Sequence, residues 1–434
     1  MRKKVMIRHI LRVFIIAIIA CGVHSSGLAL TNEEVFSQFQ FNLITPGARA
    51  TALGGAFIGL ADDATTVGTN PAGLTILNVP EVSIELKHIS YTAEHLYENR
   101  NPETDITKRE FDDSVGSVSF VSVVYPYKRF VFSLYRQELV NYKSSYQTGV
   151  FPIDIPGTDR AFYPMDASVD LTVINYGIGA AIHLFEGFSI AVSPIRSHMK
   201  MISHSTRFGL NTSPGPTDFM ETDVVGSSEI DNEDIGYSVN AGILWKPHPK
   251  VSIGAVYRSG AEFTVTETIP GQRGYDPDLT EFTLKVPDSS GVGTAFRVTD
   301  FLTLTLDAVH IRYEDLLEDF DIVMDPSEFT KENYTVDNTT EVHFGVEYIL
   351  TLEERLLALR AGVYNEPDHT IRFTGTMEDP TFDIIGRELF PGGDDQIHIT
   401  GGLGLVISDR FQIDTAANIA DRSTQLSFSV IYRF

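Results

Sequence analysis

The sequence contains a single cysteine, Cys21, which excludes a fold held together by disulfide bonds. After the first thirty residues it has no apolar run of about 18–20 residues, so a bundle of transmembrane helices is excluded as well. Basic residues are few, with 33 Lys and Arg against 58 Asp and Glu, and the net charge of −25 argues against a nucleic-acid partner. The chain does contain 43% apolar and 11% aromatic residues, which excludes intrinsic disorder. Its length suits two or three soluble domains or one large β-barrel.

Residues 1–29 have the composition of a secretory signal peptide. Five basic residues precede an apolar run at 13–20, and Gly27-Leu28-Ala29 offers a cleavage site. The segment 18–21 is loosely similar to a lipoprotein signal, so lipidation of Cys21 is the alternative to its removal with the peptide. In both cases the mature protein is exported without a thiol pair, and packing and hydrogen bonds must stabilise it.

The last eleven residues show the clearest strand pattern. Apolar and polar side chains alternate, which is typical of a strand with one apolar face. The apolar face holds Leu426, Phe428, Val430, Tyr432 and Phe434. A terminal aromatic after such a strand resembles the assembly signal of bacterial outer-membrane barrels, here Tyr432 and Phe434. The resemblance implies the barrel-assembly machinery as a partner, and an edge strand of a soluble sandwich is the alternative.

The same alternation recurs along the chain and predicts fourteen strands. Short joints rich in Gly, Pro, Asp and Lys alternate with long connections such as 204–234 and 314–340. This alternation, with an even strand number, is typical of an outer-membrane barrel, whose closure satisfies every backbone group. We therefore predict an all-β fold, a transmembrane antiparallel β-barrel with an N-terminal plug, or hatch, in its lumen. The predicted strands are 81–91, 116–125, 130–142, 168–185, 188–203, 235–245, 251–267, 282–299, 301–313, 341–350, 356–370, 396–408, 411–420 and 424–434.

Residues 30–80, between the signal peptide and the barrel at 81–434, do not alternate. They are rich in small residues, which allow backbone to pack tightly in a confined volume. A lumen enclosed by fourteen strands is too wide for wall side chains alone to fill. The segment is therefore predicted to lie in the lumen, either as static filling or as a movable hatch. Gly54, Gly55, Asp62 and Asp63 are the residues expected to pack it.

The arrangement Gly-Gly-Ala, Ala-Asp-Asp-Ala and Asn-Pro-Ala-Gly-Leu near the mature start resembles the hatch of the FadL-type transporters. Asn70, Pro71, Ala72 and Gly73 match the hatch motif. The resemblance implies an outer-membrane channel for passive uptake of long-chain fatty acids or other hydrophobic small molecules, gated by the hatch. The opening is also similar to PorV-type barrels, which implies the alternative of a secretion-associated barrel that binds protein partners.

Charged residues supply two further hypotheses. Inward-facing arginines are candidates for holding a substrate carboxylate, because a charge that faces lipid at mid-membrane costs about 2–4 kcal/mol. The acidic connection 314–340 is either a solvated surface or a divalent-cation bridge to lipopolysaccharide. The candidate arginines are Arg136, Arg196, Arg258, Arg297 and Arg312.

Catalytic and cofactor signatures are missing from the sequence. It has no His-Glu-x-x-His, no Gly-x-Ser-x-Gly and no Gly-x-x-x-x-Gly-Lys motif. We therefore expect no enzyme activity, no cofactor and no metal site. The paired glycines at 177–179 and 291–293 are expected to mark bends or bulges within strands.

Overall fold

The computed structural model describes most of the chain after residue 42. The described residues are 43, 45–96, 108–148, 151–153, 160–162, 164–208, 224–270, 277–317, 333–352, 355–376, 383, 386–388 and 390–434. The predicted signal peptide with Cys21, and most of the acidic connection 314–340, lie outside them. In the described part of the chain, no helix has the length and apolarity needed to cross a membrane.

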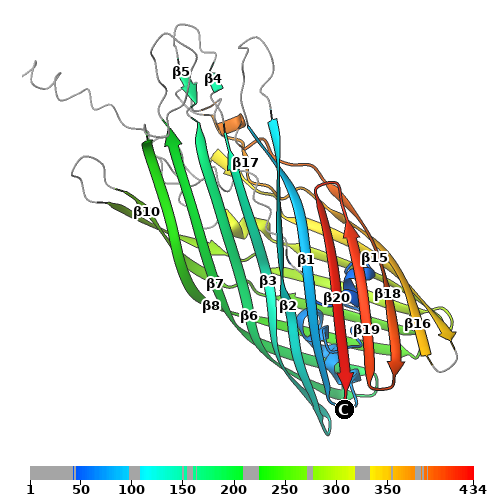
Figure 1. The fold of residues 1–434 in the computed structure, drawn as a ribbon. Helices are drawn as coiled ribbons and strands as arrows, with labels where there is room; N and C mark the ends of the chain where they lie inside the picture. The colour runs from blue at the N-terminus through cyan, green and yellow to red at the C-terminus, as the bar shows by residue number, and fades with distance from the viewer. Residues whose placement is uncertain are drawn as a thin grey trace, which may run out of the picture.

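Fourteen antiparallel strands close into a barrel in the described chain, as predicted (Figure 1). Each strand pairs with the next along the chain, the last strand pairs with the first, and β8 pairs with β9 to complete the circle. The wall strands are β1 Glu81–Leu96, β2 Lys108–Tyr127, β3 Phe130–Gln147, β6 Met165–Phe185, β7 Phe188–Phe208, β8 Val224–His248, β9 Val251–Arg258, β12 Ser289–Arg297, β13 Leu302–Ile311, β15 Thr339–Leu352, β16 Arg355–Glu366, β18 Gln396–Ser408, β19 Phe411–Ile419 and β20 Ser423–Arg433.

Shorter elements extend the wall, lie inside it or lie above it. Between β9 and β12, the strands β10 Glu262–Ile269 and β11 Asp278–Lys285 form a hairpin. The helices are α2 Ala48–Ala52, α3 Thr66–Thr69, η2 Pro71–Ile76 and η3 Tyr313–Leu317. Two small ribbons pair β4 Phe151–Ile153 with β5 Arg160–Phe162, and β14 Tyr334–Thr335 with β17 Arg372–Phe373.

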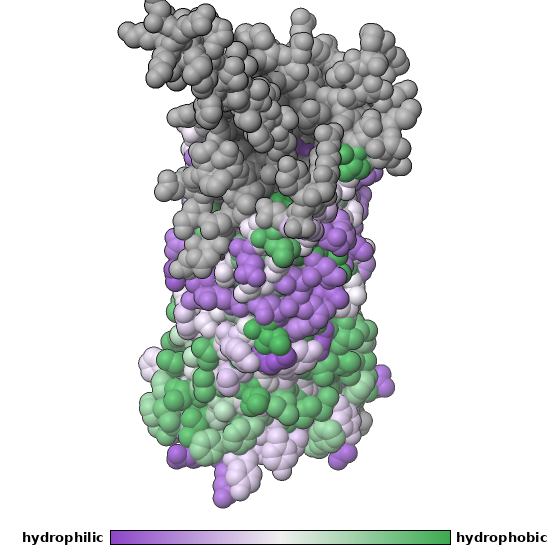
Figure 2. Space-filling view, turned by 90° about the vertical axis from the view of Figure 1, so that its left-hand side faces the viewer, coloured by the Kyte–Doolittle hydropathy of each residue, from purple (hydrophilic) through white to green (hydrophobic). Residues whose placement is uncertain are grey.

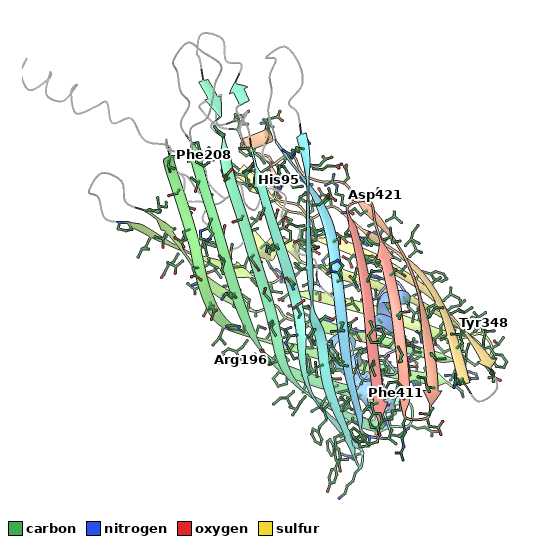
Figure 3. The ribbon with its side chains drawn as sticks, in the orientation of Figure 1. His95, Arg196, Phe208, Tyr348, Phe411 and Asp421 are labelled. Atoms are coloured by element: carbon green, nitrogen blue, oxygen red, sulfur yellow. The ribbon has the colours of Figure 1, made fainter. Side chains whose placement is uncertain are left out.

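The short joints lie together at the end of the barrel that carries the C-terminus, which we call the lower end (Figure 1). Two of these turns need a left-handed backbone, at Lys128 with φ 58° and at Gly187 with φ 74°. The short joint near Asp421 is the exception, because it lies at the other, upper end (Figure 3). Phe208 ends β7 at the upper end and Phe411 begins β19 at the lower end (Figure 3).

An apolar band surrounds the outside of the lower half of the barrel. Figure 2 shows this band below a polar surface. Several aromatics near the short turns are exposed there, among them Tyr125 (59%), Phe185 (63%) and Trp245 (46%). A band of outward apolar side chains with aromatics at its edge is what a membrane requires of a barrel.

Two predicted strands are interrupted. The segment 251–267 was expected to be continuous, but it is split at 259–261 into β9 and β10, and 282–299 is split at 286–288 into β11 and β12. Gly260 and Pro287 lie at these breaks, and both weaken a strand, since glycine adds no packing and proline cannot donate to the ladder. The predicted strand 356–370 ends at Glu366, directly before Pro367, for the same reason.

Candidate functional site

The N-terminal segment 45–80 packs against opposite walls of the barrel. Helix α2 contacts β16, β18, β19 and β20, whereas η2 contacts β3, β6, β7 and β8. Apart from Thr45, its alanines and threonines are almost completely buried. Wall glycines create the space, because a Cβ added to Gly362 would lie 2.3 Å from Gly54 N and one added to Gly242 would lie 2.2 Å from Asn70 Oδ1. Small residues on both sides let segment backbone touch wall backbone.

Asn70 forms hydrogen bonds both within the N-terminal segment and to the wall. Its Nδ2 donates to the carbonyl oxygens of Ile58, at 2.9 Å, and of Ile243 in β8, at 3.0 Å. Its Oδ1 accepts from Ala72 N at 3.2 Å and caps η2, which begins with Pro71. Gly73 has no room for a side chain, since an added Cβ would lie 2.1 Å from Ala61 O. The four motif residues therefore form one compact turn fastened to the wall.

Gly54 and Gly55 form a left-handed turn against the opposite wall. Their φ angles are 66° and 78°, which residues other than glycine rarely adopt. The carbonyl oxygen of Gly54 lies 2.7 Å from His343 Nδ1 in β15. A further wall contact comes from Asp307 in β13, whose Oδ2 accepts from Ile58 N at 2.6 Å. Side chains of β13 and β15 thus hold the backbone of the segment.

A buried ionic network connects the segment to the β15–β19 wall. Arg49 binds Glu347 in β15 at 2.9 Å and Asp62 at 2.5 Å, and Arg360 in β16 lies 2.7 Å from Glu347 and from Asp414. Burial acts to lower the pKa of Arg49, but Asp62 and Glu347 outweigh it and hold that pKa well above its usual value.

Asp62 and Asp63 have different tasks in the segment. Asp62 faces Arg49, and burial raises the pKa of Asp62 although the Arg49 charge acts to lower it. Asp63 also lies 3.7 Å from Arg49, but it accepts from Thr65 N at 2.9 Å and from Thr65 Oγ1 at 2.6 Å, and so shapes the turn before α3. These contacts give both aspartates a structural role, so neither needs a catalytic role to account for it.

Above the segment lies a lumen cavity of about 190 Å³, larger than a second one beside Arg258. Three of its rings are stacked, with centroids 4.9 Å apart for His343 and Tyr364 and 4.2 Å apart for Tyr364 and His398. Glu341 lies 3.1 Å from His343, and Glu366 lies 2.8 Å from His398. Two carboxylates outnumber one arginine, Arg422, in the lining, which makes this cavity less favourable for an anion, whereas its rings suit an uncharged ligand.

The smaller cavity, of about 80 Å³, contains Arg258, and we call it the Arg258 cavity. The guanidinium donates from Nη2 to Thr69 O at 2.7 Å and from Nη1 to Ser289 Oγ at 3.5 Å. Its buried Nε has no hydrogen-bond partner among the described residues. Arg258 also forms no ion pair with a described carboxylate. A partly buried cation with a free donor is suited to bind an anion.

The other four candidate arginines do not point into the lumen with a free donor. Arg196 lies on the outer side of β7 (Figure 3), and Arg297 is exposed at the lower end of β12. Arg312 is exposed and binds Asp315 at 3.1 Å, while Arg136 lies near Glu138 and donates to Val118 O. Of the five candidates, the structure leaves Arg258 as a possible ligand contact.

An apolar cluster fills the upper lumen. It joins inward side chains of the long strands to residues of η3, β14 and β17, which cap it from above. Ala261 and Val286 belong both to this cluster and to the lining of the Arg258 cavity, so the two are continuous. The strand residues of the cluster include Met165, Leu171, Val173, Met199, Met201, Ile230, Phe263, Val265, Phe282 and Leu284.

The wall itself is weakened between β2 and β3. The two strands pair from Tyr127 and Phe130 up to Phe120 and Gln137, and above that point β2 and β3 share no ladder. Side chains bridge the gap instead. Asp113 Oδ2 accepts from Ser145 N at 2.9 Å, and Ser117 donates to Glu138 at 2.5 Å. Tyr91 of the neighbouring strand β1 donates its hydroxyl proton to Lys143 O of β3. We call this region the β2–β3 seam.

The last strand lies where the barrel closes. Tyr432 and Phe434 are exposed on the outer face, with ring centroids 5.0 Å apart. Arg433 binds Glu81 of β1 at 2.9 Å, and Phe434 N donates to Pro80 O at 3.0 Å. The contacts place the terminal aromatics at the lower edge of the apolar band.

Several important residues were missed by the sequence argument. Glu347, Arg360 and Asp414 hold the ionic network, and His343 and Asp307 hold segment backbone. All five are charged or titratable residues at inward positions of otherwise amphipathic strands, and that position was the available signal. In the described part of the chain, no group of three or more His, Cys, Asp or Glu is arranged to hold a metal ion.

Comparison with known proteins agrees with this architecture. Residues 28–417 match the family model described as outer membrane protein transport protein (OMPP1/FadL/TodX). No curated protein matches the sequence.

Solved structures with the same fold share little sequence with the chain. A FadL homologue from Pseudomonas aeruginosa is 15% identical with a TM-score of 0.63, and the match covers 90% of this chain and 99% of that one. The Pseudomonas putida toluene transporter TodX is 14% identical with a TM-score of 0.59, covering 91% and 99%. The Ralstonia pickettii toluene transporter TbuX is 15% identical with a TM-score of 0.56, covering 91% and 100%. The chain belongs to the OMPP1/FadL/TodX family of outer-membrane transport proteins, a family of transport channels rather than enzymes.

Proposed function

We propose that this protein is a passive outer-membrane channel for long-chain fatty acids and related hydrophobic carboxylates, gated by residues 30–80 as a hatch and enclosed by a barrel at 81–434. The observation that supports this most is the free Nε of Arg258 in a cavity continuous with the apolar cluster. A carboxylate needs a cationic donor, and an acyl chain needs apolar surface next to it. The Arg258 cavity supplies the first and the cluster supplies the second.

The path begins at the upper end. The acyl chain takes the place of loop side chains that pack on the apolar cluster, since hydrophobic burial is not directional and one apolar partner can replace another. The carboxylate then binds Arg258. The larger cavity, with its two glutamates, rejects the carboxylate and accepts uncharged parts of the ligand.

The hatch motif links ligand binding to opening. Arg258 Nη2 donates to Thr69 O, which directly precedes Asn70. A carboxylate at Arg258 competes for this guanidinium, so it loosens one of the bonds that hold the motif to the wall. The exit we propose is sideways through the β2–β3 seam, because its side-chain bonds separate without breaking a ladder. Tyr432 and Phe434 we propose as the assembly signal.

The test compares Arg258→Met and Arg258→Lys in the purified barrel, with Arg297→Met as the control at an exposed site. Calorimetric titration with oleate should show at least tenfold weaker binding for Arg258→Met, because a charge-assisted hydrogen bond is worth about 1.5–3 kcal/mol. Arg258→Lys should retain part of the affinity. Toluene, which carries no charge, should bind all variants equally.

Two outcomes would contradict the proposal. Equal oleate binding by Arg258→Met and the unmodified protein would remove Arg258 as the carboxylate site. Normal cellular uptake of oleate after Asn70→Ala or Pro71→Ala, in a folded barrel, would argue against hatch gating. In that case a barrel that binds protein partners becomes the better reading.

A further inference from the structure

A second part of the wall lacks its ladder, between β8 and the split strand that follows it. Strand β8 pairs with β9 from Asn240 to His248, and with β10 at Glu229 and Ile230. Between these points, residues 231–239 of β8 have no ladder partner on this side, although the strands run next to each other. We call this region the β8–β10 seam.

One backbone bond remains in the β8–β10 seam, from Ser259 N to Val239 O at 3.0 Å, and side chains replace most of the others. Ser259 Oγ accepts from Val239 N at 2.9 Å, and Asp234 Oδ2 accepts from Thr264 N at 2.7 Å. Asp288 holds the break itself, since its Oδ1 accepts from Gly260 N at 2.8 Å and its Oδ2 accepts from the Tyr257 hydroxyl at 2.6 Å. Few hydrogen bonds, mostly through side chains, therefore join β8 to β10 across the seam. The inner face of the hairpin also packs in the apolar cluster, through Phe263, Val265, Phe282 and Leu284.

The β10–β11 hairpin is paired as one unit. It has a continuous ladder of its own, from Glu262 with Lys285 to Ile269 with Asp278. Both of its connections to the wall are broken at the same level, at 259–261 and at 286–288, and these breaks contain Gly260 and Pro287. A paired hairpin with two interrupted strands at its base has the construction of a hinged flap.

The Arg258 cavity lies directly behind this flap. Its lining includes Ser238, Ser259, Ala261, Val286 and Pro287, which are residues of the seam and of both breaks. The closure is tight, because a Cβ added to Gly236 would lie 2.9 Å from Ala261 Cβ and 2.6 Å from Glu262 O. Only the absence of a side chain at Gly236 lets the flap close against β8.

The outer face of the seam lies at the upper edge of the apolar band. Ile235 is 42% exposed and Tyr237 is 74% exposed on β8, and Tyr257 is 46% exposed on β9. Just above them, Asp231 and Glu233 are exposed. The lower part of an opening here would face the lipid chains, and the upper part would face the head-group region. An amphipathic carboxylate is most stable at this boundary.

From these observations we infer that the β10–β11 hairpin is a flap that opens the β8–β10 seam, a second lateral exit through which ligand from the Arg258 cavity leaves into the outer leaflet. The inference rests on the proposed function for the identity of the ligand. It differs from the β2–β3 exit in the strands that separate and in the cavity that it serves.

A disulfide across the seam tests this exit. Gly236→Cys with Ala261→Cys needs a strand shift of less than about 1 Å to reach the usual Cβ separation of about 3.5–4.5 Å. Residues 22–434 contain no native cysteine that could compete. Ala308→Cys with Val342→Cys, directly opposite each other in the complete β13–β15 ladder, is the matched control. Asp113→Cys with Ser145→Cys cross-links the β2–β3 seam for comparison.

We expect oxidation of the 236–261 pair to lower cellular uptake of labelled oleate at least twofold relative to the same variant kept in reductant. The comparison is made within the variant because a side chain at position 236 already shifts the hairpin before the disulfide forms. The 308–342 control should take up oleate at the unmodified rate in both states. Unchanged uptake with the 236–261 disulfide fully formed would overturn the second exit.

A second measurement does not depend on transport. Spin labels at Glu233→Cys and Thr264→Cys, both on the exposed face of the seam, should give two distances in the reconstituted barrel. Oleate should increase the fraction of molecules that show the longer distance. One short distance in all conditions would overturn the flap. Two distances in a protein that neither binds nor carries oleate would support the flap and contradict the proposed function instead.

Discussion

The lower and upper halves of the barrel have opposite polarity, although the same strands form both. On β7 the lower inward residues include Ser189 and Ser193, while the outward residues include Ile190 and Val192. Further up the same strand the inward residues are Met199 and Met201, and the outward residues are His198 and Lys200. Side chains alternate between inward and outward along the whole strand. The apolar residues face outward in its lower part and inward in its upper part.

This reversal shows which environment surrounds each half of the barrel. The lower half meets lipid outside, so apolar side chains face outward and the N-terminal segment fills a polar interior. The upper half is covered outside by polar residues (Figure 2), so its apolar residues are free to line the lumen. A hydrophobic ligand therefore meets apolar surface inside the part of the barrel that rises above the apolar band.

The largest effect is expected for the lower interior. Glu347→Ala leaves Arg49 and Arg360 without their shared carboxylate, and removing one partner of a buried ion pair costs about 3–5 kcal/mol. Denaturant unfolding of the reconstituted barrel measures this loss. Glu314→Ala, at an exposed ion pair, is the control, and an equally small loss for both would show that the network is not structural.

The next largest effect is expected for the lower exterior. Ile243→Arg places a charge in the apolar band and should lower the free energy of unfolding in lipid vesicles by about 2–4 kcal/mol. Asp231→Arg, on the outward face of the same strand above the band, should change it little. Equal losses at both positions would contradict the assignment of the band to the membrane.

The upper interior should respond in ligand binding. Met201→Ser removes apolar surface from the cluster and should weaken oleate binding by about five- to tenfold, or about 1–1.4 kcal/mol. Titration calorimetry measures the change. Ile202→Ser, on the outward side of the same strand, should bind oleate normally. If only Ile202→Ser weakens binding, the ligand approaches from outside.

The smallest effect is expected for the upper exterior. Lys200 forms an exposed ion pair with Glu233 at 3.0 Å. Water and salt screen such a pair, so Lys200→Ala should leave the unfolding midpoint within error. A clear shift of the unfolding midpoint would mean that this surface is less exposed to water than the outer surface of the lower half. The assignment of the lower half to lipid and the upper half to water would then be reversed.

The sequence predicted the wall in detail where one face alternated without interruption. The predicted strand 396–408 matches β18, and the apolar residues of the C-terminal strand share one face as predicted. The breaks at Gly260 and Pro287 were missed because apolar alternation continues on both sides of them. The missing β2–β3 ladder was missed too, since pairing is a relation between two segments and neither shows it alone.

The candidate site was predicted only in part. The motif at 70–73 was identified, but its wall contact through Asn70 and Ile243 spans 173 residues of sequence. Five arginines were equivalent candidates, and only the closed barrel shows that Arg258 points inward with a free donor.

The sequence by itself determined the fold class, the strand number and which residues of each strand share a face, because these follow from local alternation and turn chemistry. Only the tertiary structure decided which face meets lipid at each level, which ladders are incomplete, and which buried charges lack a partner. Those properties depend on closing the barrel around its N-terminal segment, which brings distant positions within bonding distance.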